Sequence, residues 1–242
     1  MVGAAARLTV AASVALGLIA CNPDPSDQMT ESVGYRPADD DEQQSGERGN
    51  LVISEVLWSG SVNGDGVWDV TDAFVELRNE GSFPTNVSKW RLDMTGAIVR
   101  TWILPDMAPL DVGEHVFIAT KNTGCFPSPD GVLPDLEFGR GDLFELTLRD
   151  SDERLIEGAG DDLAPPFVGG WDGVRSRSME RVELMFGGEG SEAQAWHFYT
   201  PIAVDVPNDD RILDTCRGRT LASPGRANSP DYSGAFASGN FD

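Results

Sequence analysis

The fold is decided by one stretch of sequence, Leu51-Val52-Ile53-Ser54-Glu55-Val56-Leu57-Trp58. One face of this stretch, read with a period of two, carries Leu51, Ile53 and Leu57, and the other carries Val52, Val56 and Trp58. A strand whose two faces are both apolar is typical of the centre of a packed sheet. The stretch therefore predicts a central β-strand over residues 51–58.

Further short β-prone segments follow this strand, and turn residues separate them. They cover residues 73–78, 90–94, 99–104, 115–120, 143–148, 154–157, 178–185 and 195–200. The separators include Asn79-Glu80-Gly81 and Asp111-Val112-Gly113, which have turn chemistry. Short strands at this spacing predict an all-β sandwich or barrel. Residues 159–177, rich in Pro and Gly, are expected to form a long loop.

The residues before this domain predict an export signal. A short apolar run over residues 8–19 is too short to span a bilayer, and it follows a single positive charge at Arg7. The run ends in Leu18-Ile19-Ala20-Cys21, which resembles the bacterial lipobox. That resemblance implies that the thiol of Cys21 is acylated and that residues 1–20 are removed. The alternative is an ordinary signal peptide that is cleaved nearby.

Composition gives the rest of the organisation. Residues 21–49 are acidic and contain almost no large apolar side chain, so they predict a disordered tether between the lipid and the domain. The β-domain covers residues 50–230, and residues 231–242 are expected to be a disordered tail. The formal net charge is -22, from 18 Lys and Arg against 40 Asp and Glu. Such a charge repels phosphate backbones, so no nucleic-acid partner is expected.

Six short motifs occur in a fixed order along the domain. They are an I-x-E strand at 51–56, an F-V-E-L-x-N strand at 73–79, an S-x-W-x-L strand at 87–92, a hairpin at 104–118, an S-x-E-R element at 178–182, and Trp196 with a closing S-P-G-x-x-N at 223–228. Together they resemble the lamin-tail domain of bacterial secreted proteins. Residues 123–138 and 159–177 look like expansions of that pattern. The resemblance implies an immunoglobulin-like β-sandwich with a binding or scaffolding role and no catalytic residue.

Two acids interrupt the apolar strands and are the first candidates for chemistry. Glu55 and Glu76 lie on expected neighbouring strands, where two carboxylates match a glycosidase-like pair. The alternative is structural: the two carboxylates accept backbone donors at a strand edge or pair with Arg181, since a buried carboxylate needs a partner. The residue Trp90, two positions from Leu92, is expected to fill the core from one strand face.

The other catalytic signatures are missing from the sequence. Its two histidines, His115 and His197, are expected to be packed or surface residues, and no H-E-x-x-H, C-x-x-C, P-loop or G-x-S-x-G motif occurs. Arginines such as Arg175 and Arg217 are interleaved with acids, as on a solvated face. We therefore expect a non-catalytic, lipid-anchored protein of the cell envelope, on the outer membrane or cell surface, that binds a protein, glycan or matrix component. The alternative is a secreted or surface hydrolase with an unrecognised acidic site.

The other two cysteines, Cys125 and Cys216, form an even number once Cys21 carries lipid. Outside the cytoplasm such a pair predicts a disulfide, and the alternative is two free thiols.

One loop after the first strand has the spacing of a calcium site. Its oxygen ligands would be Ser61, Asn63, Asp65, Asp69 and Asp72, with the backbone carbonyl of Val67. Gly66 lies where such a loop turns sharply. Calcium is therefore the one expected cofactor. The alternative is a hairpin connection whose acids are solvated.

Overall fold

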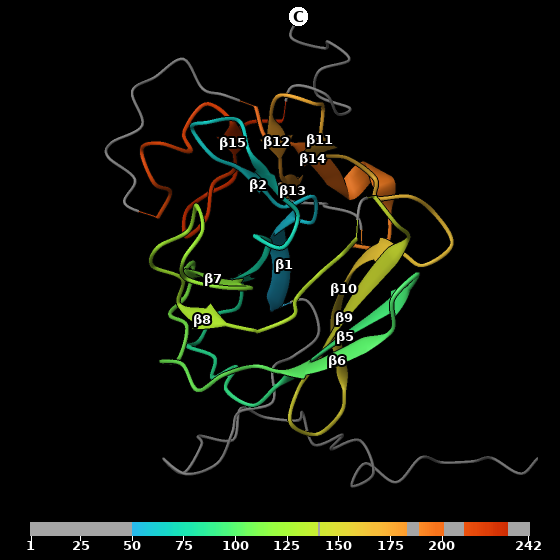
Figure 1. Ribbon diagram of the computed structural model, residues 1–242. Coiled ribbons are helices and arrows are strands. Elements are labelled where there is room, and N and C mark those ends of the chain that lie inside the picture. Colours follow the sequence, from blue (N-terminus) through green and yellow to red (C-terminus); the bar gives the residue numbers. More distant parts are fainter. Residues whose placement is uncertain (1–49, 140, 183–188, 201–210, 232–242) are drawn as a thin grey trace, which may run out of the picture. The chain divides into compact units, whose positions relative to one another are not determined.

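The computed structural model describes residues 50–139, 141–182, 189–200 and 211–231, all within one compact unit (Figure 1). These residues form an all-β structure, and no α-helix occurs among them. Cys21, the tether and most of the expected C-terminal tail lie outside the described residues. In the described part, no helix has the length and apolar character to cross a membrane.

The larger sheet has six strands in the order β14-β13-β1-β4-β7-β8. Their bounds are Trp196–Phe198 (β14), Met179–Arg181 (β13), Leu51–Leu57 (β1), Phe74–Asn79 (β4), His115–Ala119 (β7) and Gly131–Val132 (β8). All neighbours are antiparallel except β7 and β8, which are parallel. Strand β1 lies inside this sheet and every one of its residues is buried, which confirms the prediction of a central strand.

The second sheet has four antiparallel strands in the order β10-β9-β5-β6. Their bounds are Leu155–Asp161 (β10), Phe144–Arg149 (β9), Arg91–Gly96 (β5) and Arg100–Ile103 (β6). Strand β9 alternates buried and half-buried residues, as expected of a strand with one face against a core.

Two small sheets complete the described structure. A three-stranded sheet joins Gly170–Trp171 (β11), Ser176–Arg177 (β12) and Thr220–Leu221 (β15), and a hairpin joins Ser61–Val62 (β2) to Trp68–Asp69 (β3). A 3₁₀ turn covers Ala193–Ala195. Residues 159–177 were expected to form a loop without strands, and this expectation is wrong. They include the end of β10 and both β11 and β12, which are too short to give a periodic signal.

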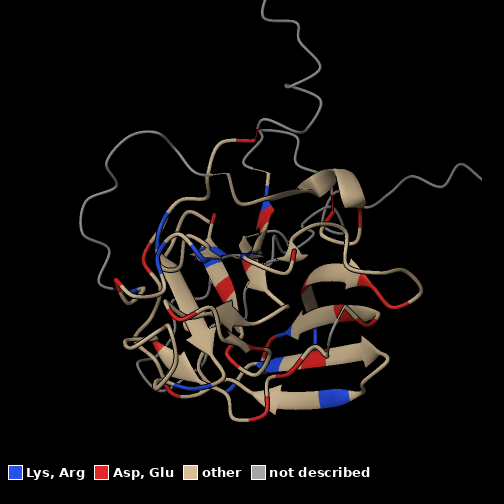
Figure 2. Cartoon of the chain, turned by 45° about the horizontal axis from the view of Figure 1, so that its top comes forward, with Lys and Arg blue, Asp and Glu red and all other residues tan. Residues whose placement is uncertain are grey.

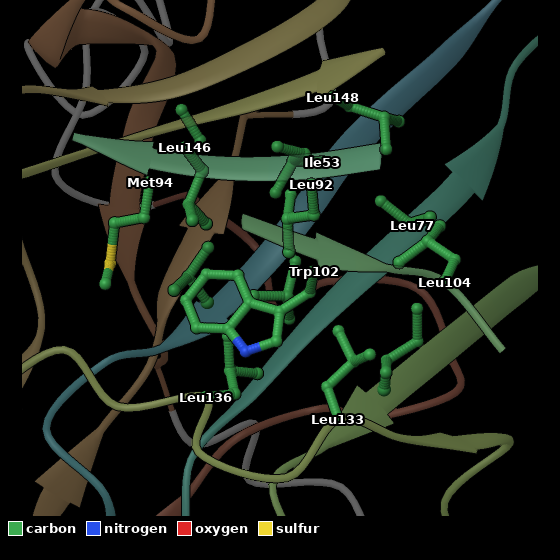
Figure 3. Packing of buried hydrophobic residues seen from close by; sticks show 14 of the residues in the cluster. Ile53, Leu77, Leu92, Met94, Trp102, Leu104, Leu133, Leu136, Leu146 and Leu148 are labelled. Atoms are coloured by element: carbon green, nitrogen blue, oxygen red, sulfur yellow. The ribbon is translucent and has the colours of Figure 1, made fainter. Parts of the chain in front are cut away.

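The two larger sheets share one hydrophobic core. Ile53 and Leu77 of the six-stranded sheet meet Leu92, Leu146 and Leu148 of the four-stranded sheet in the same space (Figure 3). Trp90 and Leu92 are both buried in this core, as predicted from their spacing.

The alternation of side chains between the two faces of β1 is inverted in the middle of the strand, and the sequence gives no sign of this. Ile53 and Val56 both belong to the core between the sheets, whereas Leu57 belongs to a second cluster. The pairing of β1 with β4 shifts register between Ile53 and Glu55, as at a β-bulge. An extra residue there inverts the alternation, so the assignment of Leu57 to the face of Leu51 is wrong.

The second cluster lies around the disulfide. Cys125 and Cys216 are bonded, with a Cα–Cα distance of 5.8 Å across a sequence separation of 91, which confirms the predicted pair. Phe74, Phe117 and Phe126 pack edge to face beside it. Both faces of the six-stranded sheet are therefore covered.

Candidate functional site

Three buried glutamates lie side by side across the six-stranded sheet. Glu55 of β1 is paired in register with Glu180 of β13 on one side and with Glu76 of β4 on the other. All three side chains are fully buried, with an exposed fraction of 0%. We call them the glutamate row. Such a row is costly unless each carboxylate has hydrogen-bond donors.

A backbone donor to each carboxylate comes from one segment near the end of the described chain, Ser223–Ser229, which we call the closing segment. The backbone N–H of Ser223 donates to Glu55 at 2.9 Å, that of Gly225 to Glu76 at 2.5 Å, and that of Ser229 to Glu180 at 3.1 Å. Glu55 and Glu76 thus accept backbone donors, as the structural alternative predicted, but they do so in the interior of the sheet and not at a strand edge. Arg181, the other predicted partner, pairs with Glu157 at 3.0 Å.

The two histidines lie at opposite ends of the row. The Nδ1 atom of His115 lies 2.7 Å from Oε1 of Glu76, and Nδ1 of His197 lies 3.8 Å from Oε2 of Glu180. Both rings pack against the protein, with side-chain exposed fractions of 8% and 2%. Neither ring faces open solvent.

Two members of the row, Glu55 and Glu180, have raised pKa values. Burial raises the pKa of Glu55 well above its ordinary value, and the charges of Glu180 and Glu76 raise it further. Burial also raises the pKa of Glu180. The hydroxyl of Ser223 lies 2.5 Å from Glu180 and 3.3 Å from Glu55. Because that hydroxyl has only one proton, both contacts are hydrogen bonds only when one carboxyl is protonated.

This arrangement binds the closing segment and is closed to a substrate. None of the three glutamates has exposed surface, so a glycoside cannot reach the pair of Glu55 and Glu76. The amide of Asn228 adds two further bonds, to the carbonyls of Ser54 and Arg181, both at 2.9 Å. Chemically, the row is a set of acceptors that fixes the closing segment on the sheet. Glu180 is not a candidate in the sequence because its short strand, Met179–Arg181, has an arginine beside it and no apolar run.

The residues of the expected calcium loop form the β2–β3 hairpin. Ser61 is paired with Asp69, and the exposed tip between the strands includes Asp65 and Val67. The side-chain oxygen of Asn63 accepts the backbone N–H of both Asp65 and Val67, each at 3.0 Å. These bonds shape the turn.

The other two acids of that loop, Asp69 and Asp72, have different kinds of partner: Asp69 has a positive charge, and Asp72 has neutral hydrogen-bond donors. Asp69 lies 2.6 Å from the ammonium of Lys121, which is half-buried. Asp72 is buried, and one of its oxygens accepts the hydroxyl of Ser61 at 2.5 Å and the N–H of Cys125 at 2.7 Å. In the residues that the structure describes, no three His, Cys, Asp or Glu side chains gather as a metal-binding group. Calcium binding at this hairpin stays a prediction.

A charged hollow of about 490 Å³ lies beside strands β9 and β10. Its charged side chains are Glu80, Glu145, Arg149, Glu157, Arg181 and Glu189. Burial raises the pKa of Glu157, and the guanidinium of Arg181 acts against this rise. That guanidinium also lies over the ring of Trp196, 5.3 Å from its centroid. Figure 2 shows that Lys and Arg elsewhere are intermixed with Asp and Glu, as expected of a solvated surface.

An aromatic hollow of about 340 Å³ lies beside β11 and β12. It is lined by Trp58, Gly169, Gly170, Trp171, Asp172, Arg177 and Phe198. Trp171 and Phe198 are exposed over 42% and 37% of their surface. Exposed aromatic side chains that gather at a hollow make it a candidate binding surface.

Comparison of the chain with protein-family models gives no match. Comparison with curated proteins gives none either. The function is therefore inferred from the residues and their geometry alone.

Proposed function

We propose that this chain is a lipid-anchored protein of the bacterial cell envelope whose β-domain, an immunoglobulin-like sandwich of lamin-tail type, is a non-catalytic binding module. Cys21 supplies the anchor, the acidic tether separates the domain from the lipid, and the domain presents its hollows to a partner. Support for the sandwich comes from the two sheets that share one core. Support for the lamin-tail relation comes from the S-x-E-R and S-P-G-x-x-N motifs, which meet at the glutamate row.

One observation carries the binding role. The groups that resemble catalytic residues, Glu55, Glu76 and the two histidines, are buried and engaged with other residues of the fold. At the aromatic hollow, the large apolar side chains that face solvent are those of Trp171 and Phe198. Aromatic side chains contribute most of the energy at many binding surfaces because they bury a large area at a small entropic cost.

The experiment is retention of an envelope component by the full-length protein. The protein is extracted in detergent with an affinity tag and incubated with envelope extract that contains both proteins and polysaccharides. We expect one component to be retained and to be eluted chemically unchanged. Addition of the same component in free form should reduce its retention. If the protein retains no protein and no polysaccharide above the level of a resin control, the proposal is contradicted.

A hydrolase is the second candidate, and one observation favours it. The charged hollow contains Glu145 and Glu157, and burial raises the pKa of both carboxyls. A carboxyl with a raised pKa is what a general acid requires. Turnover of aryl glycosides or polysaccharides by wild type, lost in Glu157→Gln, would establish this candidate and overturn the non-catalytic role. Equal turnover by both proteins would show that Glu157 is not the general acid.

A further inference from the structure

The aromatic hollow is built from three separate parts of the chain. Trp58 follows β1 and forms its buried side, Trp171 belongs to β11, and Phe198 ends β14. The guanidinium of Arg177 lies 5.4 Å from the ring centroid of Phe198. The carboxylate of Asp172 completes the lining next to Trp171.

The aromatic planes are fixed before any ligand arrives. The indole N–H of Trp58 donates to the carbonyl of Val168 at 2.9 Å, and that of Trp68 donates to the carbonyl of Ser59 at 2.7 Å. Trp68 in turn stacks on Trp171, with centroids 4.1 Å apart and planes 11° from parallel. A surface that is already ordered loses little side-chain entropy on binding.

The hairpin that carries Trp171 is equally constrained. The Oδ1 atom of Asp172 accepts the backbone N–H of Val174 at 2.9 Å and that of Arg175 at 2.7 Å. The second oxygen of this carboxylate makes no hydrogen bond to a described residue, and Asp172 lines the hollow. The Asx-type turn therefore holds one acceptor in a set place.

A glycine keeps the hollow open. Gly170 has φ +112°, and a Cβ atom built on it would lie 2.9 Å from the ring of Trp58. Any side chain at this position would clash with the ring of Trp58 and fill part of the hollow. A backbone that approaches an aromatic ring this closely requires glycine.

We infer that this hollow binds a neutral pyranose ring of a glycan, and the inference rests on the proposed binding role. A pyranose presents an apolar C–H face, which fits against Trp171 or Phe198, and a rim of hydroxyl groups. Those hydroxyls can donate to Asp172 and accept from Arg177, so one ring can contact an aromatic side chain and both charged groups of the hollow.

Charged ligands fit these groups less well. The site for a cation over Phe198 is taken by the guanidinium of Arg177, which would repel a second cation. An anion would face Asp172 and a chain with a formal net charge of -22. A neutral ligand with many hydroxyls avoids both costs.

The test is a titration of the full-length protein in detergent with neutral oligosaccharides. The probes are cellohexaose, maltohexaose and chitohexaose, with oligogalacturonate and oligochitosan as anionic and cationic counterparts. Binding is followed by calorimetry and by tryptophan fluorescence, because Trp171 lies at the site. We expect at least one neutral probe to bind, and to bind more tightly than either charged probe.

Three variants assign the binding to the hollow. Trp171→Ala should weaken binding of the neutral probe by about tenfold or more, the effect typical of a central aromatic contact. Asp172→Asn should weaken it while keeping the turn, since the asparagine retains the Oδ1 acceptor. Phe83→Ala changes an exposed aromatic residue that does not line the hollow, and it should bind as wild type. If Trp171→Ala fails to fold, as shown by its melting curve, Asp172→Asn alone decides.

Different results would reject the pyranose site and the general binding role. If no neutral probe binds at millimolar concentration, or if Asp172→Asn and Trp171→Ala bind as wild type, the pyranose site is rejected. If an envelope component is then still retained by the protein, the binding role stands. A component that is a protein and whose retention requires Trp171 also rejects the pyranose site, because the hollow is then a protein contact. If nothing is retained or bound, both proposals fall.

Discussion

The buried carboxyl of Glu55 makes the stability of the fold depend on pH. Burial and the neighbouring glutamates raise its pKa in the folded protein above the ordinary value of 4.5. The folded state therefore binds this proton more tightly than the unfolded chain does. The resulting stabilisation is full below pH 4.5 and is lost as the pH rises through the higher folded pKa. We therefore expect the urea concentration at the unfolding midpoint to fall as the pH rises above 4.5.

The variant Glu55→Gln tests this dependence. The amide has the size of a protonated carboxyl and cannot ionise, so the fall of the urea midpoint with pH should become shallower. Glu114→Gln, which changes an exposed acid, should leave the slope as in wild type. Parallel slopes for wild type and Glu55→Gln would show that Glu55 does not take up this proton in the folded state.

At the residue scale, the sequence predicts which residues are buried but not the bulge in β1 or the donors that the buried glutamates accept. The apolar character of residues 51–58 was enough to predict a buried strand, but the extra residue near Ser54 has no signature in a run of β-prone residues. The burial of Glu55 and Glu76 followed from their apolar neighbours. Their donors did not, because Ser223 and Gly225 lie far away in sequence and donate through backbone N–H groups, which every residue except proline has.

At the scale of elements, the longer strands were predictable and the shortest were not. Strands such as β4 and β9, with six residues each, give a clear alternation or an apolar run. Strands β11, β12 and β15 have two residues each and depend on their neighbours for stability. The aromatic hollow lies on two of these short strands, which is why the sequence alone gave no candidate there.

The disulfide fixes the elements around the second hydrophobic cluster. Replacing both Cys125 and Cys216 by Ser should lower the free energy of unfolding by about 2–4 kcal/mol, since the bond closes a long loop and restricts the unfolded chain. Urea unfolding of the oxidised protein and of the double variant measures this difference. Cys21→Ser keeps the disulfide and is the matched control. An unchanged midpoint in the double variant would mean that the bond does not stabilise the fold.

The β2–β3 hairpin gives a prediction about calcium. An ion held by the predicted ligands must compete with Lys121 for Asp69 and with Ser61 for Asp72. Binding is therefore expected to be weak, in the millimolar range typical of extracellular sites. Calcium added to chelator-treated protein should raise the melting temperature, and Asp65→Ala should abolish the rise. No heat of binding and no change in melting at millimolar calcium would remove the site.

At the scale of the whole molecule, the prediction concerns attachment to the membrane. Cells that express the protein and are fed an acyl-chain analogue should label wild type, while Cys21→Ser should carry no label and should leave the membrane fraction. The double variant of Cys125 and Cys216 controls for acylation at another thiol and should be labelled as wild type. Equal labelling of wild type and Cys21→Ser would contradict the lipobox interpretation. A single acyl chain gives only marginal attachment, so stable membrane association also reports that more than one chain is present.

The closing segment has a consequence for the proposed export of the protein to the cell envelope. Ser223 and Asn228 bind residues that precede them by 168 and 174 positions. Contacts across such separations form late, because the ends of a long loop must first meet. A chain that leaves a translocation channel from its N-terminus therefore has an unprotected glutamate row until the closing segment has also emerged. On the proposed route of export, the late contacts of the closing segment would delay completion of the fold until transfer is nearly complete.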